Sequence, residues 1–280
     1  MLMFRTRFKR EILTEFLPPA RTENTKAGSG KAKHSNAGGE KVIVLCDGMP
    51  SIPRKQALAE FLAAKGYWVF YPRYRGAWES GGEFLERSPH LDILDVIGGL
   101  RHEIRELAFG RRFRVHANEI FVIGGSFGGA AAILASMDER VKKVIANCAV
   151  VDWGILRRME KSETSNPNYA AHIRAAFGSV YRLSDRNWRK LARGKFFNPA
   201  HHVDEIDASK IMMFHAKDDP NVPYASVVRF TKKTGVKLTL LQRGGHLSTD
   251  MIVRKYWRQI QTFFDEEEKL DFGSEPSLVR

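Results

Sequence analysis

The fold of this chain is decided by residues 120–134, which read IFVIGGSFGGAAAIL. Four apolar residues at 120–123 predict a buried strand, and the alanine-rich run at 130–134 predicts a helix. Between them Ser126 stands among four glycines. A nucleophilic serine on a sharp strand-to-helix turn needs such small neighbours, because the turn brings the backbone close to adjacent elements. The stretch therefore predicts a reactive serine, and a glycine-rich structural turn or an anion-binding loop is the alternative.

An acid and a base follow the serine in the chain. One predicted strand leads to Asp218 and Asp219, and the last predicted strand leads to a Gly-Gly pair and His246. A serine nucleophile needs a base within hydrogen-bond reach and a third group that orients the base. Serine, acid and histidine, each directly after a strand, is the chain order of the α/β-hydrolase fold. His215 is a weaker alternative for the base, because it precedes the acid.

Predicted strands alternate with predicted helices along most of the chain. An amphipathic helix is expected after Pro53, a second from Ser88 as N-cap through Leu107, and a third from Thr249 onward. This alternation predicts an α/β fold with a mostly parallel, doubly wound sheet. The predicted strands lie at 42–45, 69–71, 120–123, 144–151, 211–214 and 238–241.

The other segments suggest the domain organisation. Residues 1–19 predict edge strands, residues 20–40 predict a flexible loop because they are almost free of bulky apolar side chains, and residues 41–280 predict one catalytic domain. The connection across residues 154–209 is too long for a simple crossover, so we expect a helical cap at the carboxyl edge of the sheet, where ligands bind. A peripheral insertion is the alternative. The ten Lys/Arg against six Asp/Glu of the cap would favour acidic substrates if it lines the site.

The composition is that of a soluble globular protein, with 43% hydrophobic and 28% charged residues among 280. The formal net charge of +13 is scattered, so we expect a solvated basic surface, and neither nucleic acid nor a membrane as a partner. The longest uncharged run, residues 120–137, contains four glycines, which argues against a membrane helix. A charged N-terminus argues against a signal peptide, and Cys46 and Cys148 in buried runs fit a reducing, cytoplasmic setting.

Together these motifs resemble the prolyl oligopeptidase and acylaminoacyl peptidase branch of the α/β-hydrolase superfamily over residues 41–265. The peptidases of this branch carry a β-propeller ahead of the catalytic domain, and four blades would need about 160 residues. Because the first core strand follows some 40 residues into this chain, we expect no propeller here. The matching motifs are GGSFGG at 124–129, H-x-x-x-D-x-x-V-P at 215–223, GGH at 244–246, PRYRG at 72–76 and SGGEF at 80–84.

The resemblance also implies which residues form the site. It implies that Arg75 and Asp92 form buried structural ion pairs. The sequence departs from the family at Asp47, where histidine is usual, and at Ala216, where glycine is usual. The implied site consists of the nucleophile Ser126, the acid Asp219, the base His246, and the backbone N–H groups of Phe127 and Met49 as the oxyanion hole.

We therefore expect a serine hydrolase that cleaves an ester or amide (peptide) bond through an acyl-enzyme, with a small molecule or a short peptide as substrate. A carboxylesterase or thioesterase acting on a small acyl substrate is the alternative among enzymes. A non-catalytic basic binding protein on the same fold is the alternative outside them. No cofactor is implied, and no set of His, Cys and carboxylate residues has the spacing of a metal site.

Overall fold

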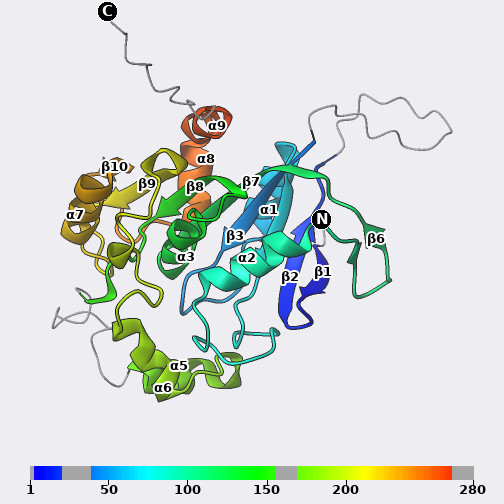
Figure 1. Ribbon diagram of the computed structural model, residues 1–280, viewed down its shortest axis with the longest axis horizontal. Coiled ribbons are helices and arrows are strands. Elements are labelled where there is room, and N and C mark those ends of the chain that lie inside the picture. Colours follow the sequence, from blue (N-terminus) through cyan, green and yellow to red (C-terminus); the bar gives the residue numbers. More distant parts are fainter. Residues whose placement is uncertain (1–2, 21–38, 155–168, 267–280) are drawn as a thin grey trace, which may run out of the picture.

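The computed structural model describes residues 3–20, 39–154 and 169–266. Its centre is an eight-stranded sheet in the order β1-β2-β4-β3-β7-β8-β9-β10 (Figure 1). The six strands from β4 to β10 in this order are parallel, whereas β1 and β2 form an antiparallel hairpin at one edge. The mostly parallel sheet that the sequence predicted is confirmed. The strands are β1 (Phe4–Phe8), β2 (Ile12–Leu17), β3 (Glu40–Cys46), β4 (Trp68–Pro72), β7 (Ala117–Gly125), β8 (Val141–Asn147), β9 (Ile211–Ala216) and β10 (Lys237–Leu241).

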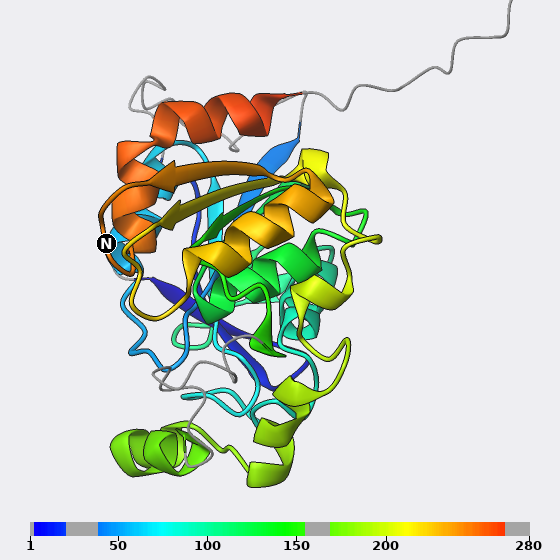
Figure 2. The same cartoon turned by 90° about the vertical axis from the view of Figure 1, so that its left-hand side faces the viewer.

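Helices cover both faces of this sheet, as the sequence predicted (Figures 1 and 2). The apolar sides of α2 (His90–Gly99), α3 (Phe127–Ala135) and α7 (Tyr224–Thr234) pack in one core cluster with one face. Those of α1 (Gln56–Ala64), α8 (Thr249–Lys255) and α9 (Trp257–Asp265) pack in a second cluster on the other face. Strands buried on both faces explain the near-continuous apolar runs in the sequence.

Helix α2 is shorter than predicted. The expected apolar stripe continued to Leu107, but the helix ends at Gly99, and two consecutive glycines close its last turn. Ile104 is instead buried in a small hairpin of β5 (Ile104–Arg105) and β6 (Arg112–Phe113), and Leu107 is 53% exposed. Ser88 was also wrong as the N-cap, because that position is Pro89 and the Ser88 hydroxyl bonds to His90.

Two other boundaries differ from the sequence prediction. Strand β8 ends at Asn147 instead of Val151, because Cys148 adopts a positive φ of 45° that leaves the extended conformation. The final predicted helix is two helices, α8 and α9, which meet at Tyr256, where the backbone leaves helical geometry (φ −105°, ψ 20°).

The connection after β8 holds α5 (Tyr169–Phe177), α6 (Asp185–Trp188) and several short 3₁₀ turns, drawn below the sheet in Figure 2. Its described part is tied to the loop after β4. The Trp78 amide donates to the Val180 carbonyl at 2.6 Å, and the amides of Phe84 and Arg182 bond across the same boundary. Residues 155–168 of the expected cap and 21–38 of the expected flexible loop lie outside the described residues. Among the helices of the described ranges, none has the length and apolar character needed to cross a bilayer.

In the loop that follows β4, Arg75 and Asp92 form an ion pair of the kind that the family resemblance implied. Arg75 pairs with Asp92 through its guanidinium, and its backbone amide donates to the same carboxylate at 2.8 Å. Asp95 and Glu11 bind the remaining edges of the guanidinium at 2.9 and 2.5 Å. Three carboxylates from two separate segments therefore hold this loop against α2 and against the turn between β1 and β2.

Candidate active site

Ser126 occupies a strained turn between β7 and α3. Its φ of 56° and ψ of −121° lie in a region that residues with a side chain rarely adopt. The turn requires glycine on both sides. A Cβ on Gly124 would lie 2.0 Å from the Gly128 carbonyl oxygen, and a Cβ on Gly128 would lie 2.5 Å from that of Asp47. The glycines thus let the backbone close tightly and bring the end of β3 beside the serine.

His246 and Asp219 meet at the ends of the last two strands. His246 Nδ1 lies 2.9 Å from Asp219 Oδ2 and 3.1 Å from Oδ1. The Asp219 side chain is fully buried, and its Oδ1 also accepts the amides of Asn221 at 2.8 Å and Val222 at 3.0 Å. Burial opposes the charged form, but these hydrogen bonds outweigh it and hold the pKa of Asp219 below its usual value. The group is therefore ionised and fixed toward one face of the imidazole.

Asp218, the neighbouring acid, points to a different partner. It is exposed and accepts the amides of Gly244 at 3.2 Å and Gly245 at 2.9 Å. These hydrogen bonds lower the pKa of Asp218. Its carboxylate therefore supports the turn that precedes His246, whereas Asp219 contacts the imidazole itself.

His215, the alternative base, is completely buried. Its Nε2 lies 2.9 Å from the Val222 carbonyl, and burial lowers the pKa of the imidazole. A neutral ring that donates Nε2–H to this carbonyl keeps its proton on the nitrogen nearest the acid. His215 is absent from the cavity that contains Ser126, so the geometry favours His246 as the base.

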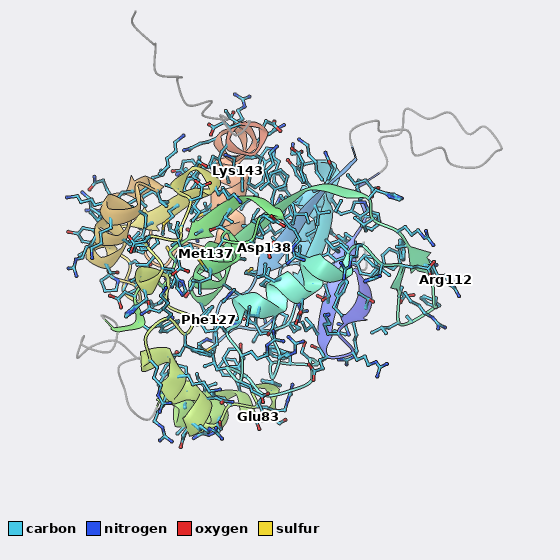
Figure 3. All side chains as sticks on the ribbon, in the orientation of Figure 1. Glu83, Arg112, Phe127, Met137, Asp138 and Lys143 are labelled. Atoms are coloured by element: carbon cyan, nitrogen blue, oxygen red, sulfur yellow. The ribbon has the colours of Figure 1, made fainter. Side chains whose placement is uncertain are left out.

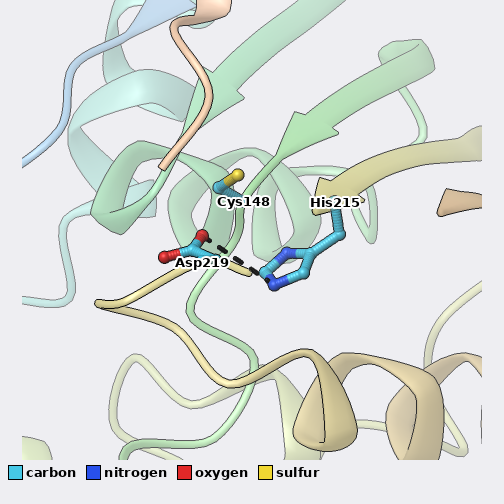
Figure 4. A group of neighbouring side chains, drawn as sticks. All are labelled: Cys148, His215 and Asp219. Carbon is cyan, nitrogen blue, oxygen red and sulfur yellow. Dashed lines mark ion pairs between the residues drawn. The ribbon is translucent and has the colours of Figure 1, made fainter. Parts of the chain in front are cut away.

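His215, Asp219 and Cys148 also form a buried cluster whose ligand atoms lie within 4.8 Å of one another (Figure 4). The chain spacing gave no sign of it, since Cys148 lies on a different strand end. The Asp219 carboxylate already accepts hydrogen bonds from His246 and from two backbone amides, so a metal ion on Asp219 would compete with these contacts. The cluster therefore fits a metal poorly.

One cavity of about 590 Å³ brings the serine and the histidine together. Its walls combine the loop after β3, the start of α3, and the loops that carry Asp219 and His246. The titratable side chains of its described lining are Asp47, Lys55, Tyr169 and His246, and Lys55 Nζ lies 3.3 Å from Asp47 Oδ1. The apolar and aromatic lining side chains are Met49, Pro50, Phe127, Val150, Trp153, Tyr169, Pro220, Val222 and Leu247.

Met49 and Phe127, the expected oxyanion donors, both line this cavity. The loop that carries Met49 adjoins the serine, because a Cβ on Gly48 would lie 3.8 Å from the Ser126 Cβ. A cis peptide bond joins Met49 to Pro50. Both residues therefore belong to the wall beside Ser126.

Asp47, the departure from the family pattern, anchors this loop. Its carboxylate accepts hydrogen bonds from the Gly48 amide at 3.0 Å, from the Ser51 hydroxyl at 2.8 Å and from the buried Tyr71 hydroxyl. With Lys55 it therefore has four partners. No role for Asp47 was predicted from the sequence, because its buried partner Tyr71 lies on β4 and only the fold brings the two together.

The expected basic cap contributes little charge to the described cavity. Of the described cap residues, Tyr169 lines the cavity, and the Lys and Arg side chains of residues 169–209 do not. Arg182, for example, donates its guanidinium to carbonyls of residues 78–82. The hypothesis that cap arginines favour acidic substrates loses its structural basis for these residues.

Sequence analysis missed Asn147 and Tyr181. Asn147 Nδ2 donates to the Leu247 carbonyl at 2.6 Å, and its own carbonyl accepts the Ser126 amide at 2.8 Å. It thus links the serine turn to the histidine loop. A polar residue at the end of a buried apolar strand was the available signal. Tyr181 accepts the Ser51 amide at 3.0 Å, a contact between cap and oxyanion loop that has no local sequence signal.

Solved structures share this fold at low sequence identity. An acylaminoacyl peptidase from Pyrococcus horikoshii matches with a TM-score of 0.62 and 18% identity over 98% of this chain and 43% of its own. An esterase from Pyrococcus furiosus matches with a TM-score of 0.61 and 15% identity, over 93% of this chain and 88% of its own. Est1E from Butyrivibrio proteoclasticus, solved with ferulic acid bound, matches with a TM-score of 0.61 and 15% identity, over 94% of this chain and 99% of its own. The chain thus spans about two fifths of the acylaminoacyl peptidases and nearly the whole of the esterases.

The family model named prolyl oligopeptidase family matches residues 54–269, which is most of the chain and includes the serine turn and both loops that carry the acid and the histidine. The sheet order and the solved structures agree with the α/β-hydrolase fold. The chain belongs to the prolyl oligopeptidase family.

Proposed function

We propose that this protein is a serine hydrolase that cleaves an ester or amide bond through an acyl-enzyme, with Ser126 as nucleophile, His246 as base and Asp219 as acid. The observation that supports this most is the strained turn that presents Ser126 to the same cavity as His246, while buried Asp219 fixes that imidazole. This combination has little purpose in a basic protein that only binds.

The proposed reaction has two halves. His246 Nε2 takes the hydroxyl proton of Ser126 as its oxygen attacks the carbonyl carbon, and the proton then passes to the leaving group as the acyl-enzyme forms. In the second half, water attacks the acyl-enzyme in the same way, with His246 again taking and returning the proton, and the carboxylic acid product is released. The amides of Phe127 and Met49 would bind the oxyanion, and Asp219 stabilises the imidazolium.

The cavity lining favours an uncharged acyl group. The carboxylate of its described part belongs to Asp47, which already has four partners, and the Lys55 ammonium is paired with it. Neither group is available to hold a substrate α-amine or carboxylate without breaking this network. Apolar walls from Met49, Val150 and Trp153 suit a neutral acyl chain or ring. We therefore place neutral esters, including thioesters, and acylated peptides ahead of peptides with a free terminus at the cleavage site.

The test pairs covalent labelling with a substrate panel. A fluorophosphonate probe should label the protein, and Ser126→Ala should abolish labelling and turnover without changing thermal stability much. Ser248→Ala is the matched control, because this other serine of the cavity lining lacks the strained turn and its loss should leave labelling intact. Turnover above about a hundredth of wild type in Ser126→Ala would reject the mechanism. Chromogenic acyl esters compared with acylated and free aminoacyl anilides would decide the substrate class.

A further inference from the structure

A second cavity of about 1020 Å³ lies on another part of the molecule and shares no lining residue with the catalytic cavity. It is formed by the end of β1, by one side of α2 and by the β5–β6 hairpin. In Figure 1 the hairpin lies at the side of the sheet opposite α7 and β10. The serine mechanism uses none of these residues.

The tip of the hairpin exposes two large apolar side chains. Phe109 is 77% exposed and Leu107 is 53% exposed, and both line the cavity. Their loop is held in place, because buried Glu106 accepts the amides of Ala108 at 2.5 Å and Phe109 at 2.8 Å. A fixed loop that exposes two large apolar side chains to water is typical of a surface that binds an apolar partner.

The same region concentrates the positive charge. Residues 5–11 and 101–114 carry nine Lys/Arg against three Glu, a net charge of +6 out of the +13 of the chain. All nine cations are exposed, and Arg112 marks the outer end of the hairpin in Figure 3. Of these cations, Arg7, Lys9, Arg101 and Arg105 line the cavity and form no ion pair with the described carboxylates. Charge that is scattered along the sequence is therefore gathered by the fold.

We propose that this surface, defined as Arg7, Lys9, Arg101, Arg105, Leu107 and Phe109, docks the protein on an anionic lipid bilayer. The arginines and lysine would approach lipid headgroups, while Phe109 and Leu107 enter the boundary with the acyl chains. Nucleic acid would use the cations and could stack on Phe109, but it gives no reason to expose Leu107 beside it. The exposed aliphatic side chain thus favours lipid. This proposal departs from the sequence expectation of no membrane partner.

The experiment is sedimentation of the full chain with vesicles of phosphatidylcholine alone or with roughly 30% phosphatidylglycerol. Binding should require the anionic lipid and weaken as salt rises from about 0.1 M to about 0.5 M. Lys9→Glu with Arg101→Glu should weaken binding about thirtyfold or more, since each cation near the surface contributes about 1 kcal/mol. Leu107→Ser with Phe109→Ser should weaken it about tenfold. Because these side chains are exposed, thermal unfolding should change little.

The matched control is Lys232→Glu with Lys233→Glu, which makes the same charge change at the end of α7, near the opposite edge of the sheet. It should bind anionic vesicles within about threefold of wild type. Equal losses in the two charge variants would overturn the proposal, because net charge alone would then explain binding. Nucleic acid would replace lipid as the proposed partner under two joint results. The variant with Leu107→Ser and Phe109→Ser would bind vesicles as tightly as wild type, and the wild-type protein would bind single-stranded RNA more tightly than vesicles. Absence of binding to anionic vesicles would also refute it.

Discussion

Asp219→Asn tests the proposed triad most sharply. Asp219 Oδ1 accepts two backbone amides and Oδ2 lies 2.9 Å from His246 Nδ1. Asparagine has one oxygen, and if that oxygen stays on the amides, its NH₂ faces Nδ1. His246 must then carry its proton on Nε2, where it cannot accept the Ser126 proton. A comparable change in a triad acid costs about ten-thousandfold in kcat, or about 5.4 kcal/mol of activation free energy.

The assay is kcat and kcat/KM on a chromogenic ester, with urea unfolding of the same variant to separate catalysis from stability. Asp218→Asn is the control, because it makes the same chemical change one residue earlier. Asp218 is exposed and holds the amides of Gly244 and Gly245, so its loss should reduce turnover by less than about tenfold. If Asp219→Asn kept more than a tenth of wild-type turnover, or if Asp218→Asn were the more damaging change, the assignment of the acid would be refuted.

Three further outcomes are expected. Asp47→Asn should lower kcat about ten- to a hundredfold at similar KM, because Asp47 anchors the loop that we propose binds the oxyanion; steady-state kinetics with unchanged kcat would contradict this. Asp92→Asn should lower the urea unfolding free energy by about 2 kcal/mol, since it removes the charge of a buried carboxylate that pairs with the partly buried Arg75 guanidinium, and a loss under about 0.5 kcal/mol would refute that. Burial lowers the pKa of His90 to about 4, so the unfolded chain takes up its proton first and stability falls as pH drops from about 6.5 toward 4. His90→Gln should reduce this fall in unfolding free energy by up to about 3 kcal/mol, whereas the exposed control His116→Gln should leave it unchanged. Parallel profiles of unfolding free energy against pH for wild type and His90→Gln would exclude the effect.

Local patterns were sufficient for the elements that carry the chemistry. The apolar run at 120–123, the glycines around Ser126 and the strand ends before Asp219 and His246 are short-range signals, because the buried strand and the tight turn constrain neighbouring residues directly. Parallel strands align their carboxyl ends at one edge of the sheet, so chain order alone predicted that the three groups share an edge. The family match is consistent with this prediction of the fold.

Tertiary structure decided what depends on distant partners. Asp218 and Asp219 have identical side chains, and only the hydrogen bonds of the folded loops distinguish them. Asp47 acquired its anchoring contact from a tyrosine on another strand, and the fold buries Ile104 in a hairpin and leaves Leu107 in water, although both continue the apolar pattern of α2 in the sequence. The charge of residues 5–11 and 101–114 looked scattered because about 90 residues separate the two segments, and they meet only in the fold. Local sequence fixes local conformation, whereas hydrogen bonding, burial and surface charge depend on which distant segments come into contact.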